Sequence, residues 1–236
     1  MSVAQTPNTF ENWNPDGFAQ GAQYQRTIRT FTSGLISGDV LDVGCGSRIF
    51  YSLENTDTWT GIDISERMLS SIEFTDEIED KKMLQGDVLD IPFEDGTFDT
   101  VTSCFLLHHL ARTNKHISAE RVQKAFHEIF RVLRPGGCLI VAENCRGHLE
   151  APYHLFFTPI YYLALKFFKT EMPYFWKPKH FIAFGKEAGF CDNPLYVHVP
   201  IVESVYQPIA GFSTPAILNG DLIQKMTVFE FIKTEI

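Results

Sequence analysis

Two aspartates that could bind polar groups of a small ligand lie beside short apolar runs. Asp42 precedes a turn at residues 44–46 that contains two glycines, and Asp63 ends an apolar run 21 positions further on. Glycines let a backbone approach a ligand closely, where a β-carbon would collide. An acid about 20 residues beyond such a turn suits the hydroxyls of a ribose. The spacing predicts a site for a nucleoside cofactor, either NAD or an adenosyl compound.

Two details favour an adenosyl compound over NAD. The third glycine of a dinucleotide turn would be residue 49, which is Ile49, so a tight pyrophosphate turn is not specified. Asp42 would repel a pyrophosphate, whereas a carboxylate there can act on the ammonium group of an amino-acid ligand. An NAD-dependent dehydrogenase is therefore the disfavoured alternative.

His108 and His109 are the candidate general bases, because they lie a few residues after the strand predicted at residues 97–103. A positioned imidazole can accept a proton from a hydroxyl or a protonated amine. In the alternative interpretation, either histidine only caps or packs. No spacing typical of metal ligands is present, so no metal is expected.

Composition limits the class of protein. The chain has 236 residues, 44% of them hydrophobic, which is enough for one well-packed core. A net charge of −9 without a basic run disfavours nucleic acid as a partner. Five cysteines without a Cys-x-x-Cys pair indicate a reducing compartment, so a soluble, cytoplasmic protein is expected. The longest apolar stretch, residues 155–168, is shorter than the roughly 20 residues of a transmembrane helix, and no signal peptide is expected.

The elements that position these residues alternate between strands and helices. Apolar, β-branched runs predict strands at 39–44, 97–103, 138–143, 195–202 and 226–233. Helical spacing predicts helices at 65–78 and 117–133, and the segment 134–137 turns the second helix into the next strand. The alternation predicts an α/β fold, a three-layer doubly wound and mostly parallel sheet with an antiparallel final strand pair. The carboxyl ends of its strands would form one ligand-binding edge.

At this point a family resemblance becomes visible in an ordered set of motifs. They are VLDVGCG at 40–46, GIDIS at 61–65, GDVLDIPF at 86–93, FD at 98–99 and LRPGG at 133–137. Together they resemble class I, Rossmann-like S-adenosylmethionine-dependent methyltransferases, most closely the branch acting on small molecules and quinones. The resemblance covers roughly residues 35–145. It implies S-adenosylmethionine as methyl donor, S-adenosylhomocysteine as product, and an in-line displacement for which the enzyme aligns the acceptor and excludes water.

The resemblance also implies roles for individual residues. Cofactor contacts are implied for Asp42, Gly44, Cys45, Gly46, Asp63, Ile64, Met68, Asp87, Val88 and Ser103. Asp42 would lie beneath the methionine portion, Asp63 would hold the ribose hydroxyls, and Asp87 would accept from the adenine amino group. Tyr24 is a further candidate for the cofactor carboxylate. Arg48 departs from the small residue frequent in the family, and it either faces solvent or reaches the same carboxylate.

One domain is predicted over residues 1–236, in four parts. They are cap helices at 1–34, a cofactor-binding core at 35–145, a lid at 146–190 and C-terminal strands at 191–236. Aromatic residues and prolines crowd the lid, which predicts one or two helices that select the acceptor. The predicted acceptor contacts are Tyr153, Tyr161, Tyr162 and Trp176, with packing onto the sheet as the alternative.

These features predict oxygen or nitrogen methylation of a small, largely apolar or aromatic metabolite. One alternative is a methyltransferase for a lipid or quinone at a membrane surface, with the aromatic stretch 153–176 in the interface. Another is a non-catalytic protein that only binds the cofactor. The partner expected in each enzymatic case is a small-molecule acceptor.

Overall fold

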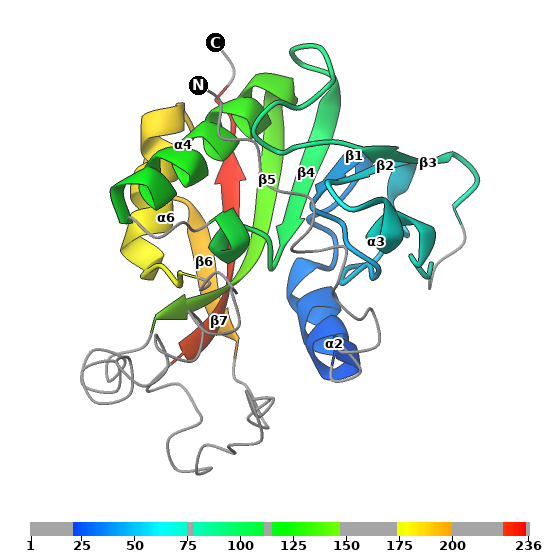
Figure 1. Cartoon of the computed structure of the whole chain (residues 1–236), viewed down its shortest axis with the longest axis horizontal. Helices are drawn as coiled ribbons and strands as arrows, with labels where there is room; N and C mark the ends of the chain where they lie inside the picture. Colours follow the sequence, from blue (N-terminus) through cyan, green and yellow to red (C-terminus); the bar gives the residue numbers. More distant parts are fainter. Residues whose placement is uncertain (1–20, 75–77, 111–114, 147–173, 200–223, 235–236) are drawn as a thin grey trace, which may run out of the picture.

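A single sheet organises the part of the chain that the structure describes. The computed structural model describes residues 21–74, 78–110, 115–146, 174–199 and 224–234. Seven strands pair in the order β3-β2-β1-β4-β5-β7-β6 (Figure 1). The strands are β1 Gly38–Val43, β2 Thr56–Asp63, β3 Lys81–Gln85, β4 Phe98–Cys104, β5 Leu133–Arg146, β6 Leu195–Val199 and β7 Gln224–Ile232. Strands β1 to β5 are parallel, whereas β7 is antiparallel to both β5 and β6. The predicted fold class and the antiparallel final pair are confirmed.

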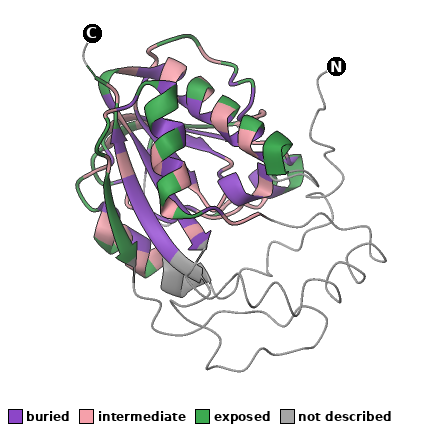
Figure 2. Ribbon diagram, turned by 90° about the vertical axis from the view of Figure 1, so that its left-hand side faces the viewer, coloured by how far each residue is buried: buried purple, intermediate pink, exposed green. Residues whose placement is uncertain are grey.

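Helices cover both faces of the sheet. They are α2 Gly21–Thr32, α3 Glu66–Ser70, α4 Lys115–Val132 and α6 Pro178–Ala188, and a 3₁₀ turn, η2, spans Leu107–Leu110. Side chains alternate between faces along each strand. On β5, Leu139 and Val141 belong to the cluster that contains the buried residues of α4 and α6. Ile140 and Ala142 belong to the opposite cluster, with Ile28 of α2. Figure 2 shows buried strands beside helices whose outer faces are exposed.

Two elements differ in length from their predictions. Helix α3 begins at its predicted cap, Ser65, but ends at Ser70 instead of continuing to residue 78. Hydroxyl groups end it, since the Ser70 side chain donates to the Arg67 carbonyl and that of Ser71 to the Met68 carbonyl. Strand β5 is longer than predicted, because the segment 134–137 is part of the strand and its Gly136 and Gly137 bond with Lys233 next to β7.

The segment predicted as a lid is only partly described. Residues 147–173 lie outside the described residues, among them Tyr153, Tyr161 and Tyr162. Residues 178–188 form α6, which packs against α4 and places Phe181 in the core beside Phe229. The described end of the predicted lid is therefore part of the helical layer on the sheet.

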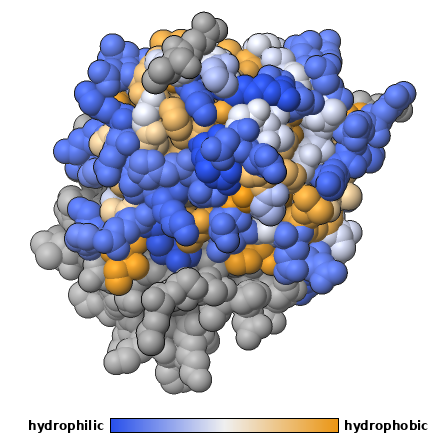
Figure 3. All heavy atoms as spheres, turned by 90° about the horizontal axis from the view of Figure 1, so that it is seen from above, coloured by the Kyte–Doolittle hydropathy of each residue, from blue (hydrophilic) through white to orange (hydrophobic). Residues whose placement is uncertain are grey.

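The amino ends of the parallel strands form the edge opposite the predicted site. The Arg134 guanidinium at the start of β5 pairs with Asp39 of β1 at 2.9 Å and with Asp99 of β4 at 2.5 Å. Figure 3 shows this edge as a mainly hydrophilic surface with scattered hydrophobic residues. Within the described ranges, no helix has both the length and the apolar character needed to span a bilayer.

Candidate active site

The glycine turn after β1 brings its backbone to the wall of a cavity. Gly44 and Gly46 have φ angles of +65° and +59°, in the left-handed region that glycine tolerates best. A β-carbon on Gly44 would lie 2.5 Å from Leu106, so no larger residue fits. The amide nitrogens of Gly44 and Cys45 donate to the carbonyl of Ile62 at 2.8 and 3.1 Å. The turn is therefore fixed against the end of β2.

Asp63 links the end of β2 to that turn. Its Oδ2 accepts from the Gly46 amide at 3.0 Å, and its Oδ1 accepts from the Ser65 amide at 2.9 Å. These two bonds orient the carboxylate while leaving it at the cavity wall, since Asp63 is among the lining residues. A carboxylate held in this way can accept further hydrogen bonds from two neighbouring hydroxyl groups.

Asp87 lies in the loop after β3 and is held by a local turn. Its Oδ1 accepts from the Leu89 amide at 2.9 Å, and its carbonyl accepts from the Asp90 amide at 2.9 Å. Val88 beside it is also part of the cavity wall.

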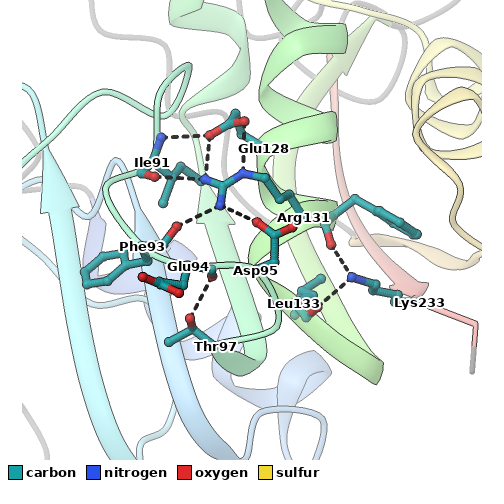
Figure 4. Close-up of polar contacts among 10 residues, drawn as sticks. Ile91, Phe93, Glu94, Asp95, Thr97, Glu128, Arg131, Leu133 and Lys233 are labelled. Carbon is teal, nitrogen blue, oxygen red and sulfur yellow. Dashed lines mark hydrogen bonds and ion pairs between the residues drawn. The ribbon is translucent and has the colours of Figure 1, made fainter.

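The continuation of this loop is fastened to α4 by Arg131 and Glu128 (Figure 4). The Arg131 guanidinium donates to the carbonyls of Ile91 at 2.9 Å and Phe93 at 2.7 Å. The Glu128 carboxylate accepts from Arg131 at 2.8 Å and from the Ile91 amide at 3.0 Å. The helix therefore fixes the path of the loop that carries Asp87.

Asp42 lies beneath the glycine turn and is 2% exposed. Burial raises the pKa of its carboxyl group to about 7, an effect partly offset by the hydrogen bond from Tyr51. Among the described residues, its Oδ1 has no hydrogen-bond partner. The charge of the Asp42 carboxyl group therefore changes near neutral pH.

The two histidines occupy different positions in η2. His109 lines the cavity, and burial followed by the charge of His108 lowers its pKa well below the usual value. His108 is buried behind it, with its Nδ1 2.6 Å from Oε1 of Glu143. The rings of His108 and His109 lie 4.0 Å apart between centroids. Of the two, His109 is the one that lies at the cavity wall.

One cavity collects the loops after β1, β2, β3 and β4. It is an open cavity of about 870 Å³, a volume that includes solvent at its mouth. Its lining comprises Gly44, Cys45, Gly46, Ser47, Arg48, Phe50, Asp63, Ile64, Met68, Gly86, Asp87, Val88, Cys104, Phe105, Leu106 and His109. Burial raises the pKa values of the Cys45 and Cys104 thiols, which keeps them protonated and unreactive. In the described part of the chain, no group of His, Cys, Asp or Glu side chains could hold a metal ion.

The structure brings most of the predicted cofactor residues to this wall, with some exceptions. Asp42 and His108 lie behind the wall, and Ser103 is fully buried in β4, so its neighbour Cys104 takes the lining position. Trp176 differs from its predicted contact with the acceptor, because its indole ring is 2% exposed and packs against Phe184. The side chain of Tyr24, in α2, is outside the described residues.

Several lining residues carry no signal that the sequence analysis used. Phe50, Phe105 and Leu106 form an apolar part of the wall, in which the rings of Phe50 and Phe105 meet edge to face at 5.2 Å. Phe105 has a φ of +55°, uncommon for a residue with a side chain. Only its position directly after β4 could have pointed to the site.

Comparison with known families agrees with this geometry. Residues 41–141 match the family model described as a methyltransferase domain. This part of the chain is therefore similar to a methyltransferase domain. The matched range begins in β1 and ends in β5, and so includes every loop that lines the cavity.

Curated relatives and solved structures extend the comparison. A demethylmenaquinone methyltransferase of Staphylococcus aureus (strain MRSA252) is 33% identical over 160 residues, which cover 62% of this chain and 62% of that protein. A methyltransferase solved in complex with the Haloferax volcanii Trm112 methyltransferase activator has a TM-score of 0.67 at 17% identity, covering 98% of both chains. A Haemonchus contortus phosphoethanolamine N-methyltransferase 2, solved with S-adenosyl-L-methionine, has a TM-score of 0.62 at 17% identity, covering 99% of this chain and 61% of that one. The two solved structures share the fold of this chain.

Proposed function

We propose that this protein transfers the methyl group of S-adenosylmethionine to a small, largely apolar or aromatic acceptor. The observation that carries the proposal is the order of groups along one edge of the sheet. Asp87, Asp63, the glycine turn and His109 follow β3, β2, β1 and β4, which are neighbours in that order. Adenine, ribose and methionine groups would thus meet suitable partners in sequence, with the methyl group toward β4.

The residues present fit this cofactor. Asp63 and Asp87 are hydrogen-bond acceptors for hydroxyl and amino groups, and Gly46 faces open space among the described residues. Ionised Asp42 beneath the turn favours the ammonium group of the methionine portion. A neighbour of the same fold was solved with S-adenosyl-L-methionine, which supports the choice of cofactor.

The protein's own contribution to the reaction is alignment and proton removal. The cofactor supplies a methyl group that is already electrophilic because it is bonded to a sulfonium. The apolar wall of Phe50, Phe105 and Leu106 would orient the acceptor and exclude water from it. His109 would accept the proton that an oxygen or nitrogen acceptor loses, since its lowered pKa keeps the ring neutral at neutral pH.

A quinone or lipid acceptor at a membrane surface is the second candidate. It is favoured by one observation, the 33% identity to demethylmenaquinone methyltransferase of Staphylococcus aureus. The match covers 62% of the length of that relative, so its substrate is carried to this chain only as a proposal.

Calorimetric titration with S-adenosylmethionine tests the cofactor site. We expect Asp63→Ala to weaken binding at least tenfold, because the ribose hydroxyls lose their acceptor. A hydrogen bond to a charged group contributes about 1.5–3 kcal/mol. Asp57→Ala, at an exposed position of β2, is the matched control and should bind like the unaltered protein. Equal affinities for both variants would overturn the ribose site.

Methyl-labelled cofactor identifies the acceptor class. The purified protein is incubated with a cell extract, and small molecules, lipids, proteins and nucleic acids are then separated. Label in a discrete water-soluble molecule supports the first candidate, and label in the lipid fraction or in added demethylmenaquinone supports the second. Label in protein or nucleic acid would contradict both.

A further inference from the structure

Glu143 is a buried carboxylate at the carboxyl end of β5 that has no part in the function proposed above. Its side chain is 1% exposed and accepts three hydrogen bonds. Oε1 lies 2.6 Å from Nδ1 of His108 and 2.8 Å from the Asn144 amide nitrogen, and Oε2 lies 3.3 Å from the His108 amide nitrogen. A buried charge is strongly unfavourable unless its oxygens are satisfied in this way. The contacts show which atoms the carboxylate orients.

These contacts determine the tautomer of His108. Both oxygens of Glu143 face backbone N–H donors, so the carboxyl group acts as an acceptor. Nδ1 of His108 must then carry a proton and donate it to Oε1. Proton exchange by this ring is confined to its other nitrogen, Nε2. A glutamine at position 143 could not satisfy all three donors, because its amide nitrogen would face one of them.

The oriented ring of His108 packs against the ring of His109. The two rings lie 4.0 Å apart, and Phe175 stacks on His108 at 5.1 Å. His108 does not line the cavity, whereas His109 does, together with the titratable or charged groups Arg48, Cys45, Cys104, Asp63 and Asp87. Of these surroundings, it is the charge of His108 that adds to burial in lowering the pKa of His109.

We propose that Glu143 is a positioning residue that orients His108 and thereby holds the His109 ring at the cavity wall as the proton acceptor in methyl transfer. The inference rests on the proposed function. A ring nitrogen of His109 takes the proton of the acceptor while the acceptor atom bonds to the methyl carbon and the carbon–sulfur bond breaks. The proton then passes from His109 to water.

The kinetic test compares two glutamate variants. Glu143→Gln keeps the shape of the side chain but breaks the set of three donors, so we expect the rate constant for methyl transfer to fall about tenfold. That is less than the roughly hundredfold loss expected when a general base is removed. The dissociation constant for S-adenosylmethionine should stay within about twofold. Glu230→Gln, on the neighbouring strand β7, is the matched control and should change neither quantity.

An NMR experiment on the histidine rings tests the inference without any activity. In the unaltered protein, nitrogen-15 spectra should show His108 protonated at Nδ1, and Glu143→Gln should replace this single tautomer by a mixture. His108→Asn can still donate to Glu143 but lacks the imidazole charge, so the pKa of His109 should rise toward the ordinary value.

The outcomes separate this inference from the proposed function. Unchanged His108 spectra in Glu143→Gln, or an unchanged His109 titration in His108→Asn, would overturn the positioning role of Glu143 even where methyl transfer is observed. If no acceptor is methylated but the spectra change as expected, the orientation of His108 by Glu143 is supported and the proposed function fails. A normal rate in Glu143→Gln, beside an inactive His109→Ala, would also overturn the positioning role.

Discussion

The hydroxyl group of Tyr51 donates a 2.9 Å hydrogen bond to Oδ2 of Asp42. The hydroxyl oxygen of Tyr51 in turn accepts from Nε1 of Trp59 at 2.8 Å and from Oγ1 of Thr102 at 2.9 Å. These four side chains are buried at or near the ends of three strands, between the glycine turn and the core. Burial outweighs the donors on Oδ2 of Asp42, and among the described residues its Oδ1 has none, so the ionised form is poorly stabilised.

This arrangement predicts that Asp42 lowers the stability of the folded protein as pH rises. The pKa of its carboxyl is about 7 in the folded protein, against 3.8 without the fold. Between about pH 4 and 7, the folded state holds a proton that the unfolded state has lost. The free energy of unfolding should therefore fall as pH rises through this range, by up to about 1.4 kcal/mol per pH unit.

Asp42→Asn should remove this contribution. Urea unfolding at pH 5, 6, 7 and 8 measures it as the difference between the variant and the unaltered protein, which cancels other titrating groups. The variant should gain stability relative to the unaltered protein as pH rises. Asp57→Asn, at an exposed site on β2, serves as control and should give parallel curves. Parallel curves for Asp42→Asn would mean that Asp42 ionises without difficulty.

The two glycines of the turn predict different costs of substitution. Gly44→Ala places a methyl group 2.5 Å from Leu106 and also adopts a positive φ, so we expect a loss of about 2–4 kcal/mol in the free energy of unfolding. Gly46→Ala shares the positive φ but meets no atom of the described residues within 4 Å, so we expect about 1 kcal/mol. Thermal and urea unfolding of both variants measure the difference. Equal losses would show that Leu106 moves aside freely.

The sequence was sufficient to predict the strand-end residues because their placement is a local property. Asp63 and Asp87 each follow a strand, and parallel strands bring their carboxyl ends to one edge. His109, which comes after β4, lines the same cavity. Strand order therefore converts three separate local patterns into one cavity.

Contacts between distant side chains could not be predicted in this way. Glu143 meets His108 across 35 positions of sequence, and neither residue type nor spacing distinguishes this pair from a surface pair. Trp176 resembled a ligand contact in an aromatic stretch, but the packing of α6 on the sheet buries it. The end of α3 depends on serine hydroxyls that compete with the helix, an outcome that periodicity does not encode.

The fastening of the Asp87 loop to α4 predicts a further difference between variants. Arg131→Gln removes the donors to the carbonyls of Ile91 and Phe93, so the free energy of unfolding should fall by about 1–3 kcal/mol. Affinity for S-adenosylmethionine should also fall, because the loop that carries Asp87 loses its support. Lys186→Gln removes an exposed ion pair with Asp192 and should cost less than about 0.5 kcal/mol. Calorimetric titration and urea unfolding check both values, and a cofactor affinity unchanged in Arg131→Gln would show that the loop keeps its position unaided.

His109 predicts a pH dependence opposite in sign to that of Asp42. Its pKa lies well below the ordinary 6.5 in the folded protein, so below pH 6.5 the unfolded state binds a proton that the folded state excludes. Stability from this group is complete above pH 6.5 and is lost as pH falls below that value. His109→Asn should therefore gain stability relative to the unaltered protein on acidification, as measured by urea unfolding at pH 5 to 8.

The same pKa shift predicts where methyl transfer loses its base. Because His109 stays neutral below pH 6.5, the rate of methyl transfer should begin to fall at a lower pH than it would with an ordinary histidine as base. This fall is the acid limb of the pH–rate profile. Single-turnover rates from pH 5 to 8 measure the limb directly. In His108→Asn the limb should move to higher pH, since the neighbouring charge that lowers the pKa is gone. A limb at or above pH 6.5 in the unaltered protein would contradict a neutral His109 as the proton acceptor.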